Sequence, residues 1–194
     1  MIEDIKAICN GRLGTLAYFY FDFKDSSKRD IRSLLSSILF QLSDQSDESW
    51  SILYRLYTTH REGLNQPREA DLTKCLQDML NVNGQRPTFI IVDAVDECPS
   101  TPGFPSAREK VLSLMETLVG SHPDLRICIT SRPEKDIQMV LEPLTSHHIS
   151  LHDQGGQNNN YVRSVVHSDR TMRRWRPEDK ELVIDTLIER ADGM

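Results

Sequence analysis

Three acidic side chains follow a strongly apolar run in the middle of the sequence. The run Phe89-Ile-Ile-Val-Asp93 continues into Ala-Val-Asp96-Glu97, so three carboxylates stand within five residues. Such a run is typical of a buried parallel strand, and open α/β sheets bind ligands at the carboxyl ends of these strands. Carboxylates placed there lose hydration unless a cation or hydrogen bonds compensate. The acids therefore predict a cation-dependent site at the end of a strand.

Each acid has an expected role. Mg²⁺ takes one or two carboxylates together with phosphate oxygens, so Asp93 is the expected magnesium ligand, directly or through water. Glu97 or Asp96 would orient or deprotonate an attacking water. The alternative is structural: an acidic helix N-terminus or solvated loop that follows an ordinary strand.

A second polar cluster follows a later apolar run. The segment Ile127-Cys-Ile-Thr130-Ser-Arg132-Pro ends in hydroxyl groups and an arginine. A guanidinium group offers a fixed fork of donors that matches phosphate oxygens, so Thr130 and Arg132 are expected to face the terminal phosphate of a nucleotide. The alternative for Arg132 is an ion pair with Glu134 or another nearby acid.

Alternating strand and helix patterns would position both clusters. Short apolar or aromatic runs predict strands at 16–23, 88–93, 125–130 and 148–151. Apolar residues at helical spacing predict helices near 31–42, 50–57, 72–80, 111–119 and 137–141. Ser106 and Glu109 predict a capping box at the start of the fourth of these helices. Strands separated by helices indicate an α/β fold with a parallel sheet.

The segment after the expected sheet differs in character. Residues 154–160 are polar and contain glycine, which predicts a loop. Apolar residues at helical spacing beyond it predict two helices, the second beginning near Pro177. We therefore expect a core domain over residues 1–155 and the start of a helical region over 156–194.

Together these segments resemble the NACHT subclass of STAND P-loop NTPases, particularly fungal NLR-like proteins with a nephrocystin-3-like N-terminal NTPase domain. IIVDAVDECP resembles the Walker B segment of that family, and ICITSRPE resembles its sensor 1 segment. The runs AYFYFDFKD, LLSSILFQL, VLEPLTSHHISL and DKELVIDTLIERADGM extend the likeness over essentially the whole chain. The resemblance implies a three-layer α/β P-loop NTPase fold with a parallel sheet and helical additions at the C-terminal end.

The resemblance also implies roles for single residues. Asp93 matches the Mg²⁺-associated Walker B acid, and Arg132 matches the sensor arginine near the terminal phosphate. Asp96 and Glu97 match the acidic pair that follows Walker B, with Glu97 activating water. Such proteins are cytoplasmic switches in which ATP or GTP binding and slow hydrolysis control the change from a closed state to an open homo-oligomer. Fungal members are linked to innate immunity and cell death, with protein partners bound through effector and repeat domains.

The Walker A loop of that family is not found in the sequence. This loop, G-x-x-x-x-G-K-[ST], should precede the first helix, yet the sequence contains no Gly-Lys pair. Residues 1–9 resemble the rear of the helix that follows the loop, so we expect a fragment whose first strand is missing. Binding of Mg²⁺ and ATP or GTP by this chain alone should then be weak or absent. The alternative function is a non-catalytic interaction or scaffold module that retains the NACHT fold.

Composition argues against several other classes. A net charge of -6 disfavours nucleic acid as a partner, because phosphate neutralisation requires an excess of Lys and Arg. No apolar run reaches the ~18 residues of a membrane span, so no membrane partner is expected. The 4 cysteines and 6 histidines lack metal-ligand spacing, which favours a reduced, intracellular protein without a zinc site.

Overall fold

The computed structural model describes residues 14–82, 87–101, 104–150, 155–169 and 171–190. The chain divides into two compact units, Met1–Thr145 and Ser146–Met194. This division falls at Thr145, whereas the sequence pattern placed the end of the core at residue 155. Residues 1–9, which resemble part of a helix, lie outside the described residues.

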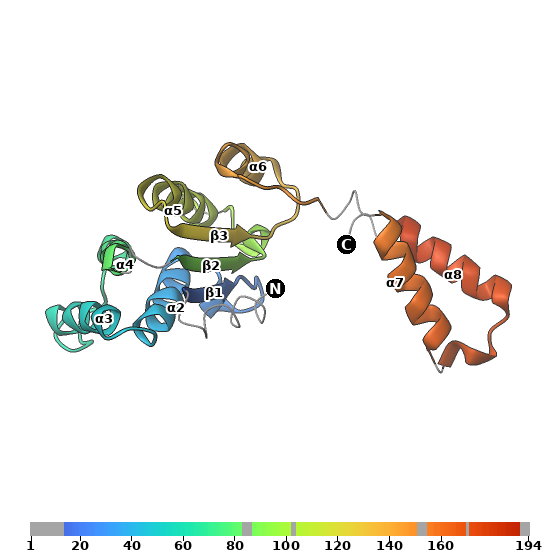
Figure 1. The fold of residues 1–194 in the computed structure, drawn as a ribbon, viewed down its shortest axis with the longest axis horizontal. Coiled ribbons are helices and arrows are strands. Elements are labelled where there is room, and N and C mark those ends of the chain that lie inside the picture. Colours follow the sequence, from blue (N-terminus) through green and yellow to red (C-terminus); the bar gives the residue numbers. More distant parts are fainter. Residues whose placement is uncertain (1–13, 83–86, 102–103, 151–154, 170, 191–194) are drawn as a thin grey trace. The chain divides into compact units, whose positions relative to one another are not determined.

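A parallel sheet forms the centre of the first unit (Figure 1). Its strands are β1 (Thr15–Tyr20), β2 (Thr88–Asp93) and β3 (Leu125–Ile129), in the order β1-β2-β3. The register places Thr15 beside Thr88, and Thr88 beside Leu125. The expected pairing of segment 16–23 with 88–93, and of 88–93 with 125–130, is therefore confirmed.

Helices occupy the segments between and after the strands. They are α2 (Ile31–Ser43), α3 (Asp47–Thr59), α4 (Glu69–Val82), α5 (Ala107–Ser121) and α6 (Lys135–Leu141). Side-chain caps define several starts, because the first N–H groups of a helix have no partner within it. Asp30 caps α2 and Ser46 caps α3, while Ser106 and Glu109 form the expected capping box of α5.

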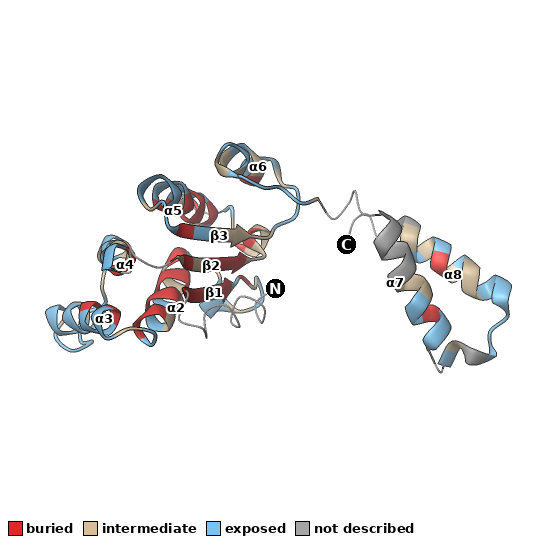
Figure 2. Cartoon of the chain, viewed as in Figure 1, coloured by how far each residue is buried: buried red, intermediate tan, exposed pale blue. Residues whose placement is uncertain are grey.

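Both faces of β2 are buried, which identifies it as a central strand. Ile90 and Val92 belong to the main hydrophobic core together with buried residues of α2, α4 and α5. Figure 2 shows β2 coloured mostly as buried. Ile91 points to the opposite face and is only 2% exposed. A strand covered on both faces is typical of a sheet between two other layers. The fold is α/β and consistent with the expected three-layer P-loop arrangement.

One expected strand is absent. Residues 148–150, part of the segment predicted as a strand at 148–151, have no strand structure, and Ile149 is 73% exposed. Residue 151 lies outside the described residues. A short apolar run becomes a strand only where a neighbouring strand supplies backbone partners. The described sheet consists of β1, β2 and β3, and the segment 148–150 is not among its strands.

The second unit consists of helices. It contains α7 (Gly155–Ser168), a 3-10 turn at Thr171–Arg174, and α8 (Pro177–Arg190), which begins at the proline expected there. Val166 of α7 and Ile184 of α8 are buried. The loop predicted at 154–160 is therefore wrong for residues 155–160, which form the first turns of α7. Extending an existing helix costs less than nucleating one, so low local propensity is overcome here.

None of the helices in the described ranges combines the length and the apolar character that crossing a bilayer requires.

Candidate functional site

The two polar clusters of the sequence lie at the same end of the sheet. Asp93 is the last residue of β2, and Asp96 and Glu97 belong to the 3-10 turn Val95–Glu97 that follows. Thr130 and Arg132 come directly after β3. Because β2 and β3 are parallel neighbours, their carboxyl ends bring these side chains together.

Thr130 joins the ends of the two strands. Its hydroxyl donates a hydrogen bond to Asp93 Oδ1 at 2.5 Å and accepts one from the Ala94 N–H at 3.0 Å. Its backbone N–H donates to the Val92 carbonyl and its own carbonyl accepts from the Val95 N–H, both at 3.0 Å. The first of these bonds orients the Asp93 carboxylate, and the other three join Thr130 to the backbone at the end of β2.

The backbone bends sharply after Asp93. Ala94 has φ 56° and ψ 50°, the left-handed region that residues with a Cβ rarely adopt. A conformation of this kind costs about 1 to 3 kcal/mol and is concentrated at functional sites. The bend turns the chain into the acidic 3-10 turn beside the strand ends.

The acids of this site have different partners. Asp96 Oδ1 accepts a hydrogen bond from the Arg132 N–H at 3.1 Å, and its Oδ2 lies 3.5 Å from Arg132 Nε. Glu97 Oε2 accepts from the Phe23 N–H, beyond the end of β1, at 3.2 Å. The three carboxylates therefore do not converge on one point. Across the residues that the structure describes, no group of three or more His, Cys, Asp or Glu side chains is arranged to hold a metal ion.

Asp93 alone still fits a nucleotide-associated magnesium site. Mg²⁺ in such sites takes one or two carboxylates and obtains its other ligands from phosphate oxygens and water. One oxygen of Asp93 is fixed by Thr130, and the other has no hydrogen-bond partner in the described chain. The residues present therefore suit a metal that arrives with a phosphate group.

Arg132 forms the ion pair considered as the alternative to a phosphate contact, with Asp96 as its partner. The Arg132 side chain is 71% exposed, whereas that of Asp96 is 10% exposed. The guanidinium group is thus open to solvent and meets Asp96 only through the 3.5 Å contact of its Nε, which leaves its other donors available to a phosphate.

A buried arginine that sequence reasoning missed supports both loops. The side chain of Arg108, at the start of α5, is 7% exposed. Its Nε donates to the Cys98 carbonyl at 2.9 Å and its Nη2 to the Asp96 carbonyl at 2.5 Å. Its Nη1 bonds Glu134 and, at 3.1 Å, Asp136 Oδ2. Arg108 thereby connects the acidic turn after β2 to the segment after β3.

The charge of Arg108 is secured by its acidic partners. Burial opposes the charged form, but hydrogen bonds to Glu134 and Asp136 raise the pKa of the guanidinium above its ordinary value. Those acids lie 26 and 28 residues away along the chain, so no local sequence pattern predicts their contact with Arg108. One feature of the sequence does point to Arg108: it precedes the buried Val111 and Leu112 by three and four residues, on the same helix face.

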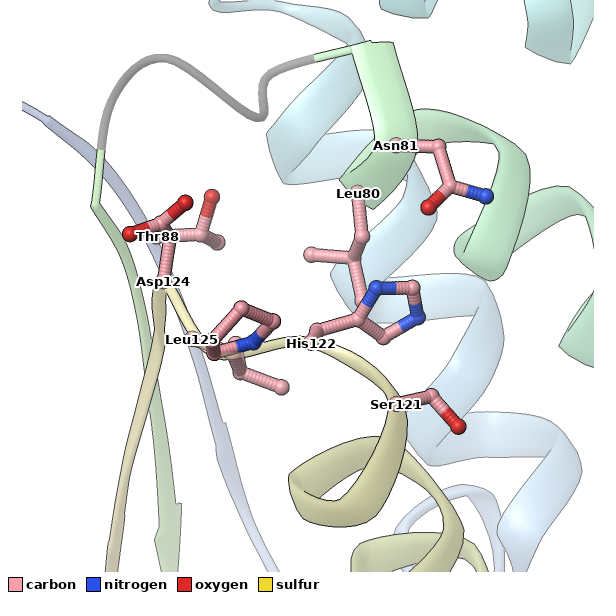
Figure 3. Close-up of a pocket in the computed structure, with 8 residues that line it drawn as sticks. Leu80, Asn81, Thr88, Ser121, His122, Asp124 and Leu125 are labelled. Atoms are coloured by element: carbon pink, nitrogen blue, oxygen red, sulfur yellow. The ribbon is translucent and has the colours of Figure 1, made fainter.

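A small cavity of about 110 Å³ lies at the opposite end of the sheet (Figure 3). Its lining comes from the ends of α4 and α5 and the starts of β2 and β3, and includes Leu80, Thr88, His122 and Leu125. The buried Nε2 atom of His122 has no hydrogen-bond partner in the described residues. Because Thr88 begins β2 and Asp93 ends it, this cavity is separate from the acidic site.

Comparison with protein families matches most of the chain. The family model described as Nephrocystin 3, N-terminal, matches residues 1–132. The matched region includes β1, β2 and β3 and ends at Arg132, so it contains all five predicted site residues. No curated protein and no solved structure shows significant similarity to the chain.

Proposed function

The chain belongs to the nephrocystin-3 N-terminal family, and from this premise we propose that it is part of a nucleotide-binding switch with slow ATP or GTP hydrolysis. The observation that carries the proposal is the meeting of two pairs, Asp93 with Thr130 and Asp96 with Arg132, at the carboxyl end of a parallel sheet. Ligands bind at this end in open α/β folds.

The geometry supports a distinct role for each residue. Asp93, oriented by Thr130, would hold Mg²⁺, which neutralises phosphate charge when bound. Arg132 would exchange its ion pair with Asp96 for the terminal phosphate. Glu97, held by the Phe23 N–H, would orient the attacking water.

We extend the proposal to the setting of the switch. By its resemblance to NACHT-type STAND proteins, it would act in the cytoplasm within an NLR-like immune signalling protein, bind protein partners through other domains and form a homo-oligomer in its open state. Affinity for nucleotide in this chain alone should be low, because the 194 residues contain no Gly-Lys pair to supply the phosphate-binding loop and its lysine.

Backbone amide NMR during titration with millimolar MgATP or MgGTP tests the proposal. We expect saturable shifts in residues 93–97 and 130–132 that require Mg²⁺ and disappear in Asp93→Asn. The Asp179→Asn variant, at an exposed position of the second unit, should behave like the parent. Shifts that persist unchanged in Asp93→Asn, or that map elsewhere, would contradict the proposed site.

A second candidate function is a non-catalytic interaction module. It is favoured by the engagement of all three acids in contacts within the fold, to Thr130, Arg132 and the Phe23 N–H. In that case residues 93–97 would not respond to Mg²⁺ and nucleotide, although Thr130→Val would still destabilise the fold. The same titration therefore separates the two functions.

A further inference from the structure

The outer edge of β1 is covered by two glutamine side chains. In a strand, the backbone groups of alternate residues point to opposite sides. The N–H groups of Thr15 and Phe21 donate toward the β2 side, to the Pro87 and Asp93 carbonyls. Leu16 and Tyr18 therefore direct their N–H and C=O groups away from the sheet.

Gln45 binds both backbone groups of Leu16, and Gln41 binds both of Tyr18. The Leu16 N–H donates to Gln45 Oε1 at 2.9 Å, and Gln45 Nε2 donates to the Leu16 carbonyl at 2.7 Å. The Tyr18 N–H donates to Gln41 Oε1 at 3.1 Å, and Gln41 Nε2 donates to the Tyr18 carbonyl at 2.7 Å. A carboxamide has the same donor and acceptor as a peptide group, so the two side chains replace a neighbouring strand.

The spacing of the two glutamines matches the strand. Four residues of helix advance about 6 Å, close to the roughly 6.6 Å between alternate residues of a strand. The remaining donors are also used, because Gln45 Nε2 donates to the Gln41 carbonyl at 2.7 Å and Gln41 Nε2 to Ser37 Oγ at 3.1 Å. Both carboxamides are therefore fixed in position.

We propose that Gln41 and Gln45 form a clamp that closes the β1 edge, and that the surface beneath the clamp fits β1 of a second copy of this chain. An uncovered edge strand is a template for pairing with another chain. The six residues of β1, Thr-Leu-Ala-Tyr-Phe-Tyr, contain no charge and no proline. Short segments of this composition pair readily with identical copies. Opening the clamp would expose Leu16 and Tyr18 for antiparallel pairing.

Gln41→Ala/Gln45→Ala in the full chain tests the clamp directly. At protein concentrations low enough to keep the variant monomeric, we expect hydrogen exchange at the Leu16 and Tyr18 amides to accelerate by about threefold to tenfold, the equivalent of one hydrogen bond each. Light scattering after size-exclusion chromatography should show a dimer that grows with protein concentration. The control is Gln77→Ala/Gln138→Ala, which changes two helical glutamines whose amides bond no strand in the described residues and should match the parent.

Two further pairs of variants keep the test decisive if the alanine pair fails to fold. Asparagine at positions 41 and 45 keeps the amide but is too short to reach β1, so it should give the same dimer. Glutamate keeps the length but sets a carboxylate oxygen against the Leu16 and Tyr18 carbonyl groups in place of each Nε2 donor, so it should open the clamp and give the same dimer. Monomeric alanine or asparagine variants with the exchange rates of the parent would overturn the proposal. A dimer whose newly protected amides lie outside β1 would overturn it equally.

Discussion

At the scale of single residues, Arg108 has the most demanding environment in the described chain. It is a buried cation that supplies hydrogen bonds to two carbonyl groups and two carboxylates from different loops. Removing it leaves all four acceptors without their donor.

We expect Arg108→Met to lower the free energy of unfolding by about 2 to 4 kcal/mol. The loss should be smaller than for a wholly buried ion pair, because Glu134 and Asp136 are about half exposed and can be hydrated. Urea denaturation followed by circular dichroism measures it. Arg126→Met, which removes an exposed arginine, is the control and should change stability by no more than about 0.5 kcal/mol. Equal losses in the two variants would show that Arg108 does not connect the loops.

The buried thiols predict a specific pH dependence. Burial raises the pKa of Cys75 to about 11 and that of Cys98 to about 12, from an ordinary value of 9.0. The unfolded chain therefore releases these protons first as pH rises. The contribution of the protonated thiols to the free energy of unfolding should therefore be fully present below pH 9. It should decline as the pH rises through 11 to 12.

Denaturation midpoints measured from pH 8 upward test the thiol prediction. Cys75→Ala/Cys98→Ala should lose less stability than the parent over the same interval, since lysine and tyrosine titration affects both proteins alike. Identical pH profiles for the two proteins would show that the thiols do not contribute.

The sequence predicted that five polar residues would gather at the ends of β2 and β3, but not the contacts that fix them. Asp93 and Thr130 were predictable because apolar strands end abruptly in polar groups, and parallel strands align their ends. The left-handed bend at Ala94 and the Phe23 contact depend on backbone geometry that residue types do not reveal. Arg108 was missed because its partners come from distant segments of the chain.

At the scale of elements, a predicted helix or strand matched the structure where residue types within the sequence mark its ends. β2 spans Thr88–Asp93 as predicted, since its apolar run ends in an acid. The strand predicted at 148–151 was wrong for residues 148–150, because strand structure depends on a pairing partner that the local sequence does not include. Local sequence patterns therefore predict an element well where a change of residue type marks its end. They predict it poorly where the element forms only by pairing with another segment.

The cap of α5 gives a prediction at this scale. Ser106 is 2% exposed, and its hydroxyl accepts a hydrogen bond from the Glu109 N–H. Ser106→Ala should lower the free energy of unfolding by about 1 kcal/mol, because the Glu109 N–H at the start of the helix loses its acceptor. Chemical denaturation measures the change. Ser113→Ala, at an exposed position inside the same helix, should be neutral or slightly stabilising, and a comparable loss there would rule out a capping effect.

At the scale of the whole molecule, each unit contains buried apolar residues of its own. Among the described residues, the hydrophobic core of the first unit comes from residues up to Leu141, and Val166 and Ile184 are buried in the second unit. A chain that ends at Thr145 should therefore melt cooperatively, within a few degrees of the corresponding transition in the full chain. Differential scanning calorimetry of both proteins tests this. Loss of the transition on truncation would show that the first unit needs the second.

The bonds of Arg108 also have an evolutionary consequence. Two of its acceptors are carbonyl groups of Asp96 and Cys98, which any residue would supply, and two are side chains of Glu134 and Asp136. Among relatives, position 98 should then vary independently of position 108. Replacement of Arg108 by an uncharged residue should instead accompany replacement of both acids, because two carboxylates without their cation would repel each other. An alignment of the family would reveal this as covariation between positions that lie far apart in sequence.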